Sequence, residues 1–413
     1  MKERRYDVDW LRVIAMLSVF VFHCTRFFCT EDWHLKVPAS QQSDILVIVR
    51  GFLFNTWFME LFCLVSGFAS WYSLRRRTGG QYLGERVKRL LIPLYTVGMF
   101  ILVVPQDYID GVTHGRIAGT FWQWLPSYYL TLPTRAFSLT KRNYLDPVNL
   151  LPYTFSGHLW FIQMLFIITL LTLPLILYLK SERGQRLSDR LAGWSARPGG
   201  IFLFAIPLAV VQVALRWLPV TTERTWADVF WYAAFFVIGY IIAADDRFTE
   251  SIKRHGWMCL ALWMVGFWGV GGLFTIALGF DPSPGRGFSV LYVLWQIAWS
   301  ILSWSAVVFV FSLGAKYLNF TNRFLAYSNE AVLPFFLFHQ TVILIVGWFV
   351  LPWDMGNLAK FLIIAVVSFP LILFLYEVFV RRIGFMRFLF GMAPKKGRPV
   401  RQSDVKHQLL NHE

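Results

Sequence analysis

The 413-residue chain is 56% hydrophobic and 18% aromatic but only 15% charged, a balance that no water-soluble domain of this length needs to build its core. Disordered, fibrous and disulfide-scaffold proteins are therefore excluded, and a polytopic membrane protein is predicted. The net charge of +15 comes from basic residues that are spread along the chain, which argues against nucleic acid as a partner.

Ten apolar runs are long enough to cross a bilayer, which takes about 20 helical residues for about 30 Å of hydrocarbon. The first run begins at Trp10 and lacks a small-residue cleavage site, so we expect it to remain as a helix rather than be removed as a signal peptide. The fold class predicted is all-α, a polytopic integral membrane protein of about ten transmembrane helices. The expected spans are 10–29, 45–73, 90–109, 158–179, 200–218, 226–244, 256–279, 288–312, 330–352 and 358–380.

The basic residues predict the orientation of these spans. With the N-terminus inside, 28 of the 39 Lys and Arg residues fall in cytoplasmic segments or at their helix ends. Because Lys and Arg are enriched in cytoplasmic loops, both termini are predicted to be cytoplasmic. We expect residues 1–390 to form one transmembrane domain and residues 391–413 a basic cytoplasmic tail near anionic headgroups.

The longest predicted external segment runs from Gln106 to Gly157 and is rich in Trp, Tyr and Pro. Its aromatic residues suit two uses, either interfacial anchoring or stacking against sugar rings. His34 and His114 also fall in external loops, where we expect them to be solvated. The four cysteines lack the spacing of metal ligands, so no metal site is expected; they are Cys24, Cys29, Cys63 and Cys259.

Three ionisable residues fall near the middle of predicted spans, where such groups are costly unless they face a cavity or a partner. They are His23 in the first span, Glu60 in the middle of the second and His339 in the ninth. At matched depth, Glu60 could orient the His23 imidazole and raise its basicity, which describes a general base with its partner. Two alternatives stay open: a polar pair that holds helices together, or the proton relay of a transporter or flippase.

The cytoplasmic segment RVKRLLIP places Arg86 and Arg89 three residues apart at the start of the third span, on one helix face. Two guanidinium groups at the membrane surface suit a phosphate-bearing ligand from the cytosol, and ordinary positive-inside flanking is the alternative. Asp9 and Arg12 have the same spacing in the first span, where a structural ion pair is expected.

Six segments in register resemble the membrane-bound acyltransferase 3 family. They are DWLRVIAMLSVFVFH (9–23), MELFCLVSGF (59–68), RVKRLLIP (86–93), GHLWFIQML (157–165), FFVIGYIIA (235–243) and FFLFHQTVI (335–343). The match is closest to a branch that is associated with succinylation of periplasmic glucans.

The resemblance implies an inner-membrane enzyme that moves an acyl group from cytoplasmic acyl-coenzyme A to a hydroxyl of a cell-envelope or periplasmic glycan. Acyl-coenzyme A is then a co-substrate, and no cofactor is expected. His23 resembles the family's catalytic histidine, and Arg86 with Arg89 its paired arginines near the donor. His158 with Trp160 resembles the family's HxWF segment, on the side from which the glycan would approach, and His339 resembles its late histidine. His339 would either help to position the acceptor or thioester or make a structural hydrogen bond. Acetyl and succinyl both stay candidates for the acyl group, and the oligomeric state is left open.

Overall fold

The computed structural model describes residues 4–31, 33–53, 56–137, 158–217, 225–279 and 288–393. Every regular element within these ranges is a helix, which confirms the all-α prediction. The α-helices are α1 (Tyr6–Thr25), α2 (Asp44–Leu53), α3 (Phe58–Leu74), α4 (Gly79–Arg86), α5 (Val103–Thr113), α6 (Phe121–Phe137), α7 (Trp160–Lys180), α8 (Glu182–Ser195), α9 (Ala205–Leu215), α10 (Trp226–Ala244), α11 (Asp246–Val265), α12 (Val290–Tyr317), α13 (Arg323–Val350), α14 (Asn357–Leu375) and α15 (Gly384–Leu389).

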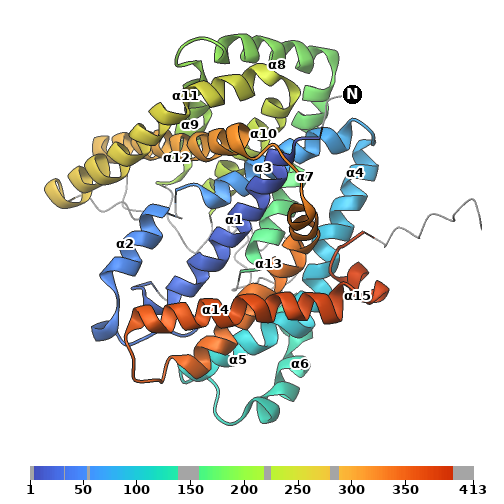
Figure 1. The fold of residues 1–413 in the computed structure, drawn as a ribbon, viewed down its shortest axis with the longest axis vertical. Coiled ribbons are helices and arrows are strands. Elements are labelled where there is room, and N and C mark those ends of the chain that lie inside the picture. Colours follow the sequence, from blue (N-terminus) through green and yellow to red (C-terminus); the bar gives the residue numbers. More distant parts are fainter. Residues whose placement is uncertain are drawn as a thin grey trace, which may run out of the picture.

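Short 3₁₀-helical or π-helical turns extend or join several of these helices. They are Arg26–Phe28, Ala39–Gln41, Val87–Leu91, Leu94–Leu102, Gly200–Phe204, Gly266–Val270, Leu273–Ala277 and Tyr376–Val380. Figure 1 shows α1 crossing the middle of the molecule, with α8 and α11 near its N-terminal end and α5 and α6 toward the opposite end.

Seven helical runs in the described part of the chain are long and apolar enough to span a membrane. They are Tyr6–Phe28, Gly79–Thr113, Trp160–Lys180, Trp226–Ala244, Val290–Tyr317, Arg323–Val350 and Asn357–Val380. The apolar helices Phe58–Leu74 and Gly200–Leu215 are shorter. The chain is thus a multi-pass membrane protein, while the count of ten spans stays a prediction.

The second predicted span, 45–73, is not one helix. It is divided into α2 and α3, because Trp57 leaves the helical region with φ −151° and a new helix begins at Phe58. Apolar residues lie on both sides of the division, and only the polar pair Asn55 and Thr56 interrupts them, too short a break to end the predicted span. As a result Glu60 lies in the first turn of α3, not in the middle of a long helix.

The third span and the loop after it also differ from the prediction. A single helical run extends over Gly79–Thr113, so Arg86 and Arg89 lie within it rather than at its start. The predicted external loop contains α6, whose Tyr128 hydroxyl donates to the Met99 carbonyl at 2.8 Å. Tyr128 is therefore a packing residue, not a platform for sugars. The rest of that loop, 138–157, lies outside the described residues, as does the predicted tail from 394 onward.

α3 and α10 pack with their backbones in direct contact. A Cβ atom added to Gly67 would lie 1.8 Å from the Phe236 carbonyl oxygen, and one added to Gly239 would lie 1.9 Å from the Leu64 oxygen. Small residues allow such close approach between membrane helices. This contact fixes the middle of α3 against α10.

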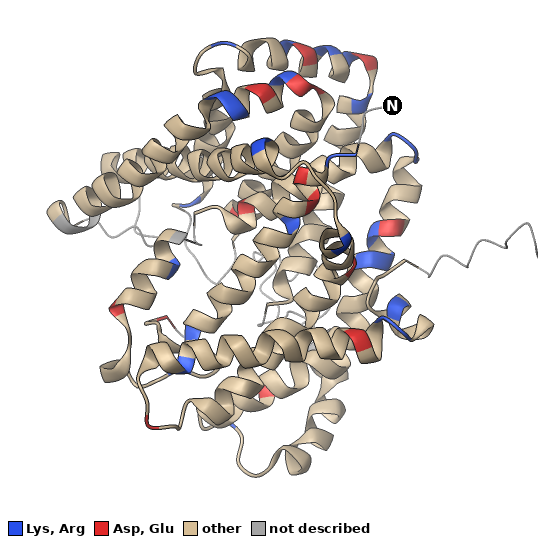
Figure 2. Cartoon of the chain, in the orientation of Figure 1, with Lys and Arg blue, Asp and Glu red and all other residues tan. Residues whose placement is uncertain are grey.

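Charged residues gather on α8 and the start of α11, whereas α12 carries few along its length (Figure 2). The first and last described segments, which include Arg4 and Ala393, line one cavity at the N-terminal end of α1. Two ends on one side of the helices are compatible with an even number of crossings, as the ten-span arrangement requires.

The predicted orientation gives an expected result for reporter fusions. A reporter after Gly184 in α8 and one at the C-terminus should both read cytoplasmic, because the basic residues concentrate in those segments. A reporter at Asn143, outside the described ranges, should read external. An external C-terminus would contradict the ten-span arrangement.

Candidate active site

Three histidines from distant parts of the chain meet inside the helix bundle. His23 comes from α1, His339 from α13, and His158 from the turn before α7. The His339 Nε2 atom lies 3.3 Å from His23 Nδ1. The His339 ring centroid is 4.8 Å from that of His23 and 4.6 Å from that of His158. Each histidine was a candidate from sequence, but their contact was not predicted.

Backbone carbonyls determine where the imidazole protons sit, since a carbonyl oxygen can only accept a hydrogen bond. His23 Nδ1 lies 2.9 Å from the Val19 oxygen, and His339 Nδ1 lies 2.6 Å from the Phe336 oxygen. Both Nδ1 atoms therefore carry the proton. The His339 Nε2 lone pair then faces the His23 Nδ1–H, and His23 Nε2 keeps its own lone pair for use as a base.

His158 has the opposite arrangement. Its Nε2 lies 3.0 Å from the Leu337 carbonyl oxygen on α13, so Nε2 is the donor. This bond ties the turn before α7 to the helix that carries His339. His158 is thereby held beside the other two rings.

His23 and His158 line a cavity of about 810 Å³ at the C-terminal end of α1. It is called the outer cavity because the predicted orientation puts this end of α1 on the external side. Glu60, Trp160 and Tyr232 line the same cavity. His339 is fully buried and contacts both other histidines. The structure therefore brings four predicted site residues to one cavity and places His339 against two of them.

The described hydrogen bonds of Glu60 and His23 run to other residues, not to each other. The Glu60 Oε1 atom accepts a hydrogen bond from Trp231 Nε1 on α10 at 3.1 Å. The described contacts of the His23 ring nitrogens are with Val19 and His339 instead. The division of the second span moves Glu60 to the start of α3, against α10, while leaving it on the cavity wall.

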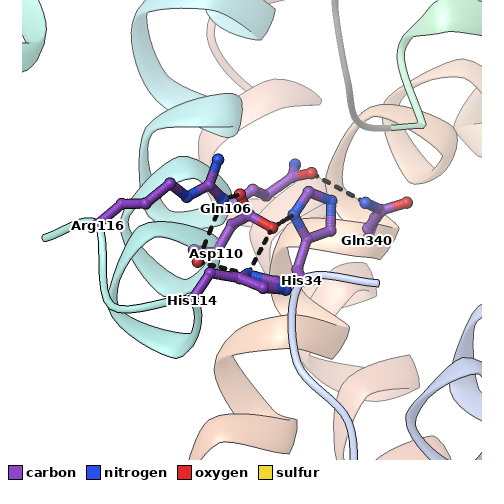
Figure 3. Close-up of polar contacts among 6 residues, drawn as sticks. All are labelled: His34, Gln106, Asp110, His114, Arg116 and Gln340. Carbon is purple, nitrogen blue, oxygen red and sulfur yellow. Dashed lines mark hydrogen bonds and ion pairs between the residues drawn. The ribbon is translucent and has the colours of Figure 1, made fainter. Parts of the chain in front are cut away.

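A polar network lies at the outer side of this cavity (Figure 3). Asp110 pairs with Arg116, its carboxylate lies 3.3 Å from His34 Nδ1, and its carbonyl accepts from His114 Nδ1 at 2.8 Å. Behind it Gln340 donates to Gln106 at 3.1 Å. The expectation that His34 is solvated is wrong, since it is buried against Asp110.

Arg50 is a cavity residue that the sequence patterns did not single out. It is the one charge in the apolar run 45–54, so the signal of an ionisable group at membrane depth was present. Its guanidinium pairs with Glu31, which follows the 3₁₀ turn after α1.

An inner cavity of about 1370 Å³ lies at the other end of α1. Nine arginines and three acidic residues of the described chain line it, and the arginines are Arg4, Arg5, Arg12, Arg75, Arg76, Arg77, Arg86, Arg89 and Arg387. Arg86 donates to Ser70 Oγ at 2.7 Å and its guanidinium carbon lies 5.0 Å from the Tyr82 ring centroid. Arg89 Nε lies 3.7 Å from Glu85. The cavity is thus strongly basic.

The Asp9 and Arg12 side chains make an ion pair at 3.5 Å on the wall of the inner cavity. Asp9 also pairs with Arg4 at 2.8 Å. This second contact joins the segment before α1 to its first turns.

An apolar partition separates the two cavities. Phe161 and Phe336 line the outer cavity, and Leu333, one turn before Phe336 on α13, lines the inner one. The Phe161 ring centroid lies 5.8 Å from that of Phe62 and 6.2 Å from that of Phe336. These three rings form the aromatic partition.

Within the described ranges, no group of three or more His, Cys, Asp or Glu residues is placed to hold a metal ion. All four cysteines are buried and free.

Comparison with known proteins identifies the family of this chain. The family pattern of acyltransferase 3, described as "Acyltransferase domain", matches residues 5–377. Glucans biosynthesis protein C of Salmonella schwarzengrund (strain CVM19633) is 24% identical over 412 residues, which cover 97% of this chain and 96% of that protein. The proteins of the same name from Salmonella heidelberg (strain SL476) and Salmonella typhi show the same identity and coverage.

No solved structure matches the chain. The family match nevertheless extends over nearly the whole sequence. The matched residues include the three clustered histidines and also Glu60, Arg86 and Arg89. The chain therefore belongs to the acyltransferase 3 family and is an acyltransferase.

Proposed function

We propose that this enzyme transfers an acyl group from acyl-coenzyme A in the inner cavity to a glycan hydroxyl in the outer cavity, with His23 as general base. The observation that carries the proposal is the position of His23. It offers a free Nε2 lone pair on the wall of one cavity, with a thin aromatic partition between it and a second, arginine-rich cavity.

The inner cavity suits the donor. Coenzyme A carries a diphosphate and a 3′-phosphate, and guanidinium groups bind phosphate oxygens through paired hydrogen bonds. Arg86 is held in place by Ser70 and Tyr82, so less freedom is lost when it binds a phosphate. With the nucleotide held there, the acyl-pantetheine arm would extend toward the aromatic partition.

The chemistry needs a base in a cavity that excludes bulk water. The acceptor hydroxyl would give its proton to His23 Nε2 as its oxygen attacks the thioester carbonyl carbon. The carbon–sulfur bond then breaks, and the proton on Nε2 passes to the departing thiolate. His339 positions the base, because its Nε2 lone pair faces the proton on His23 Nδ1.

The outer cavity suits a glycan. Trp160 and Tyr232 both line it, with ring centroids 6.3 Å apart, and aromatic faces pack well against the apolar faces of sugars. Glu60 offers a carboxylate to acceptor hydroxyls on the same wall. The relatives are named for glucan biosynthesis, which supports a glucan or other envelope glycan as acceptor. Acetyl or succinyl is the acyl group, and the inner membrane is the location.

A proton-coupled transporter or flippase is the other candidate that the sequence raised. Its relay would pass between His23 and Glu60, whereas their described contacts run to His339 and Trp231. The geometry therefore supports transfer chemistry better than a relay.

Replacing Arg86 and Arg89 together with Gln should raise the KM for acyl-coenzyme A and leave membrane insertion intact. Each lost charge-assisted hydrogen bond is worth about 1.5–3 kcal/mol, so we expect the loss of two to raise the KM roughly 100-fold or more. Steady-state kinetics of the purified protein measures it.

Arg183 and Arg186 provide the matched control, since they have the same spacing on the exposed face of α8. Replacing both with Gln removes the same charge without touching the inner cavity. If the two double variants have the same donor KM, Arg86 and Arg89 act only in membrane orientation.

The acceptor is identified by mass spectrometry of envelope glycans from cells with and without the gene. Loss of an acyl substituent, restored by the wild-type gene and not by His23→Ala, is the expected result. Unaltered glycans would contradict a glycan acceptor.

A further inference from the structure

Arg50 is a charged residue on the wall of the outer cavity that the transfer chemistry does not use. Its side chain is only 4% exposed, yet it lines the cavity. Its Nε–H has no hydrogen-bond partner in the structure. A guanidinium stays charged and carries five hydrogen-bond donors. Burying one of these donors without an acceptor costs free energy, unless a ligand supplies the acceptor.

The surroundings of Arg50 show that an oxyanion fits there. One of its Nη groups already donates to the Glu31 carboxylate, whose side chain is 46% exposed and therefore able to move away. Burial raises the pKa of Glu31, but the hydrogen bond from Arg50 and the charges of Arg50 and Arg26 outweigh it and lower that pKa. Glu31 therefore stays ionised beside Arg50, and the charge of Arg26 adds to the positive potential on this wall.

Arg50 also lies close to the reacting centre. Its guanidinium carbon is 5.6 Å from the Phe22 ring centroid, and the Phe22 ring is 5.2 Å from the His23 ring. An anionic group on either substrate could reach Arg50 while the reacting atoms lie at His23. The Nε–H is itself buried, so an anion that enters from the cavity would bind the guanidinium by displacing Glu31 from the Nη group.

We propose that Arg50 forms an anion subsite that binds a carboxylate or phosphate carried by one of the substrates, with Glu31 as its intramolecular competitor. The inference rests on the proposed function for its place in catalysis. The anion has two sources, the far end of the acyl chain or a charged substituent on the acceptor glycan. Arg50 is in either case a specificity residue rather than a catalytic one.

The test compares four substrate pairs on the purified full-length protein and its Arg50→Gln and Glu31→Gln variants. Acetyl-coenzyme A and succinyl-coenzyme A are the donors, and a neutral glucan and a phosphorylated glucan are the acceptors. Arg50→Gln should lower kcat/KM roughly 10- to 100-fold for pairs with the recognised anion, and less than about threefold for the neutral pair. If kcat/KM falls with the succinyl donor, the anion is carried by the acyl chain, and if it falls with the phosphorylated acceptor, the anion is carried by the glycan.

Glu31→Gln separates the subsite from a structural ion pair. Removing the competitor should leave kcat/KM for the anionic substrate unchanged or raise it, whereas a structural pair predicts that both variants lose activity alike on every substrate. Parallel losses on all four pairs would therefore overturn the proposal. Should Arg50→Gln fail to fold, Arg50→Lys keeps the charge but not the planar guanidinium with its paired donors. The fall in kcat/KM of this variant should again be confined to anionic substrates.

A binding measurement keeps this proposal distinct from the proposed function. Succinate and inorganic phosphate should raise the Tm of the wild-type protein more than neutral succinamide does, and Arg50→Gln should remove the difference. Equal shifts for succinate, phosphate and succinamide would overturn the subsite. Selective binding without transfer from any donor would keep the subsite and contradict the proposed function.

Discussion

His23→Ala should lower kcat for acyl transfer by about 10²- to 10⁴-fold, the contribution that a general base makes. The protein should insert normally and keep its donor KM, because the inner cavity lies beyond the aromatic partition from His23. The measurement is steady-state transfer at saturating acyl-coenzyme A, with size-exclusion chromatography to show that the variant is folded.

The same cavity supplies the controls for this prediction. His114→Ala removes a histidine from the outer cavity that pairs with Asp110, away from the cluster, and should leave kcat nearly unchanged. Glu60→Gln should lose less than His23→Ala, because Glu60 contacts Trp231 and not the imidazole. Near-full transfer by His23→Ala at normal expression would place the base elsewhere, with His339 next to be tested.

Gly239→Ala and Gly67→Ala should each destabilise the protein strongly. The added methyl group would lie within 2 Å of a carbonyl oxygen on the facing helix, so α3 and α10 would have to separate. Overpacking of this kind costs about 1–3 kcal/mol or more, and here the clash is with backbone that no rotamer change can relieve. A clear fall in Tm in detergent is the expected result, with loss of expressed protein in the more severe case.

Gly84→Ala is the matched control for the glycine variants. Gly84 lies within α4, and a Cβ added to it meets nothing within 4 Å. Alanine is favoured over glycine in helices by about 0.5–1 kcal/mol, so Tm should stay constant or rise slightly. If Gly239→Ala behaves like Gly84→Ala, the close crossing of α3 and α10 is not present in solution.

Hydrophobic runs predicted most helices, and polar residues within those runs supplied the candidate site residues. His23 and His339 were chosen because an ionisable group at membrane depth needs a reason to be there. Depth along a helix, however, says nothing about rotation around its axis. Glu60 and His23 match in depth but their described contacts differ, and the true neighbour of His23 is 316 residues away on α13.

Breaks within a helical run were the second feature that the sequence did not predict. The division between α2 and α3 falls at the short polar pair Asn55 and Thr56 in an otherwise apolar stretch, and a hydropathy average over a whole span does not register so short a break. It turns Glu60 from a mid-helix residue into a first-turn residue, where the partial positive charge of the helix N-terminus favours a carboxylate. A pattern that reads only polarity cannot detect such a change.

The aromatic partition has an electrical consequence. Three residues of α13 separate Leu333 on the inner cavity from Phe336 on the outer one, and seven residues of α1 separate Arg12 from Val19, so the layer is roughly 4.5–10.5 Å thick along these helices. If the two cavities fill with water from opposite sides, most of the membrane voltage falls across this thin apolar layer rather than across the whole bilayer. The free energy of moving an uncharged acyl group across this layer would then not depend on the voltage. An acyl group that ends in a carboxylate would be driven outward by an inside-negative potential, by about 2.3 kcal/mol per 100 mV.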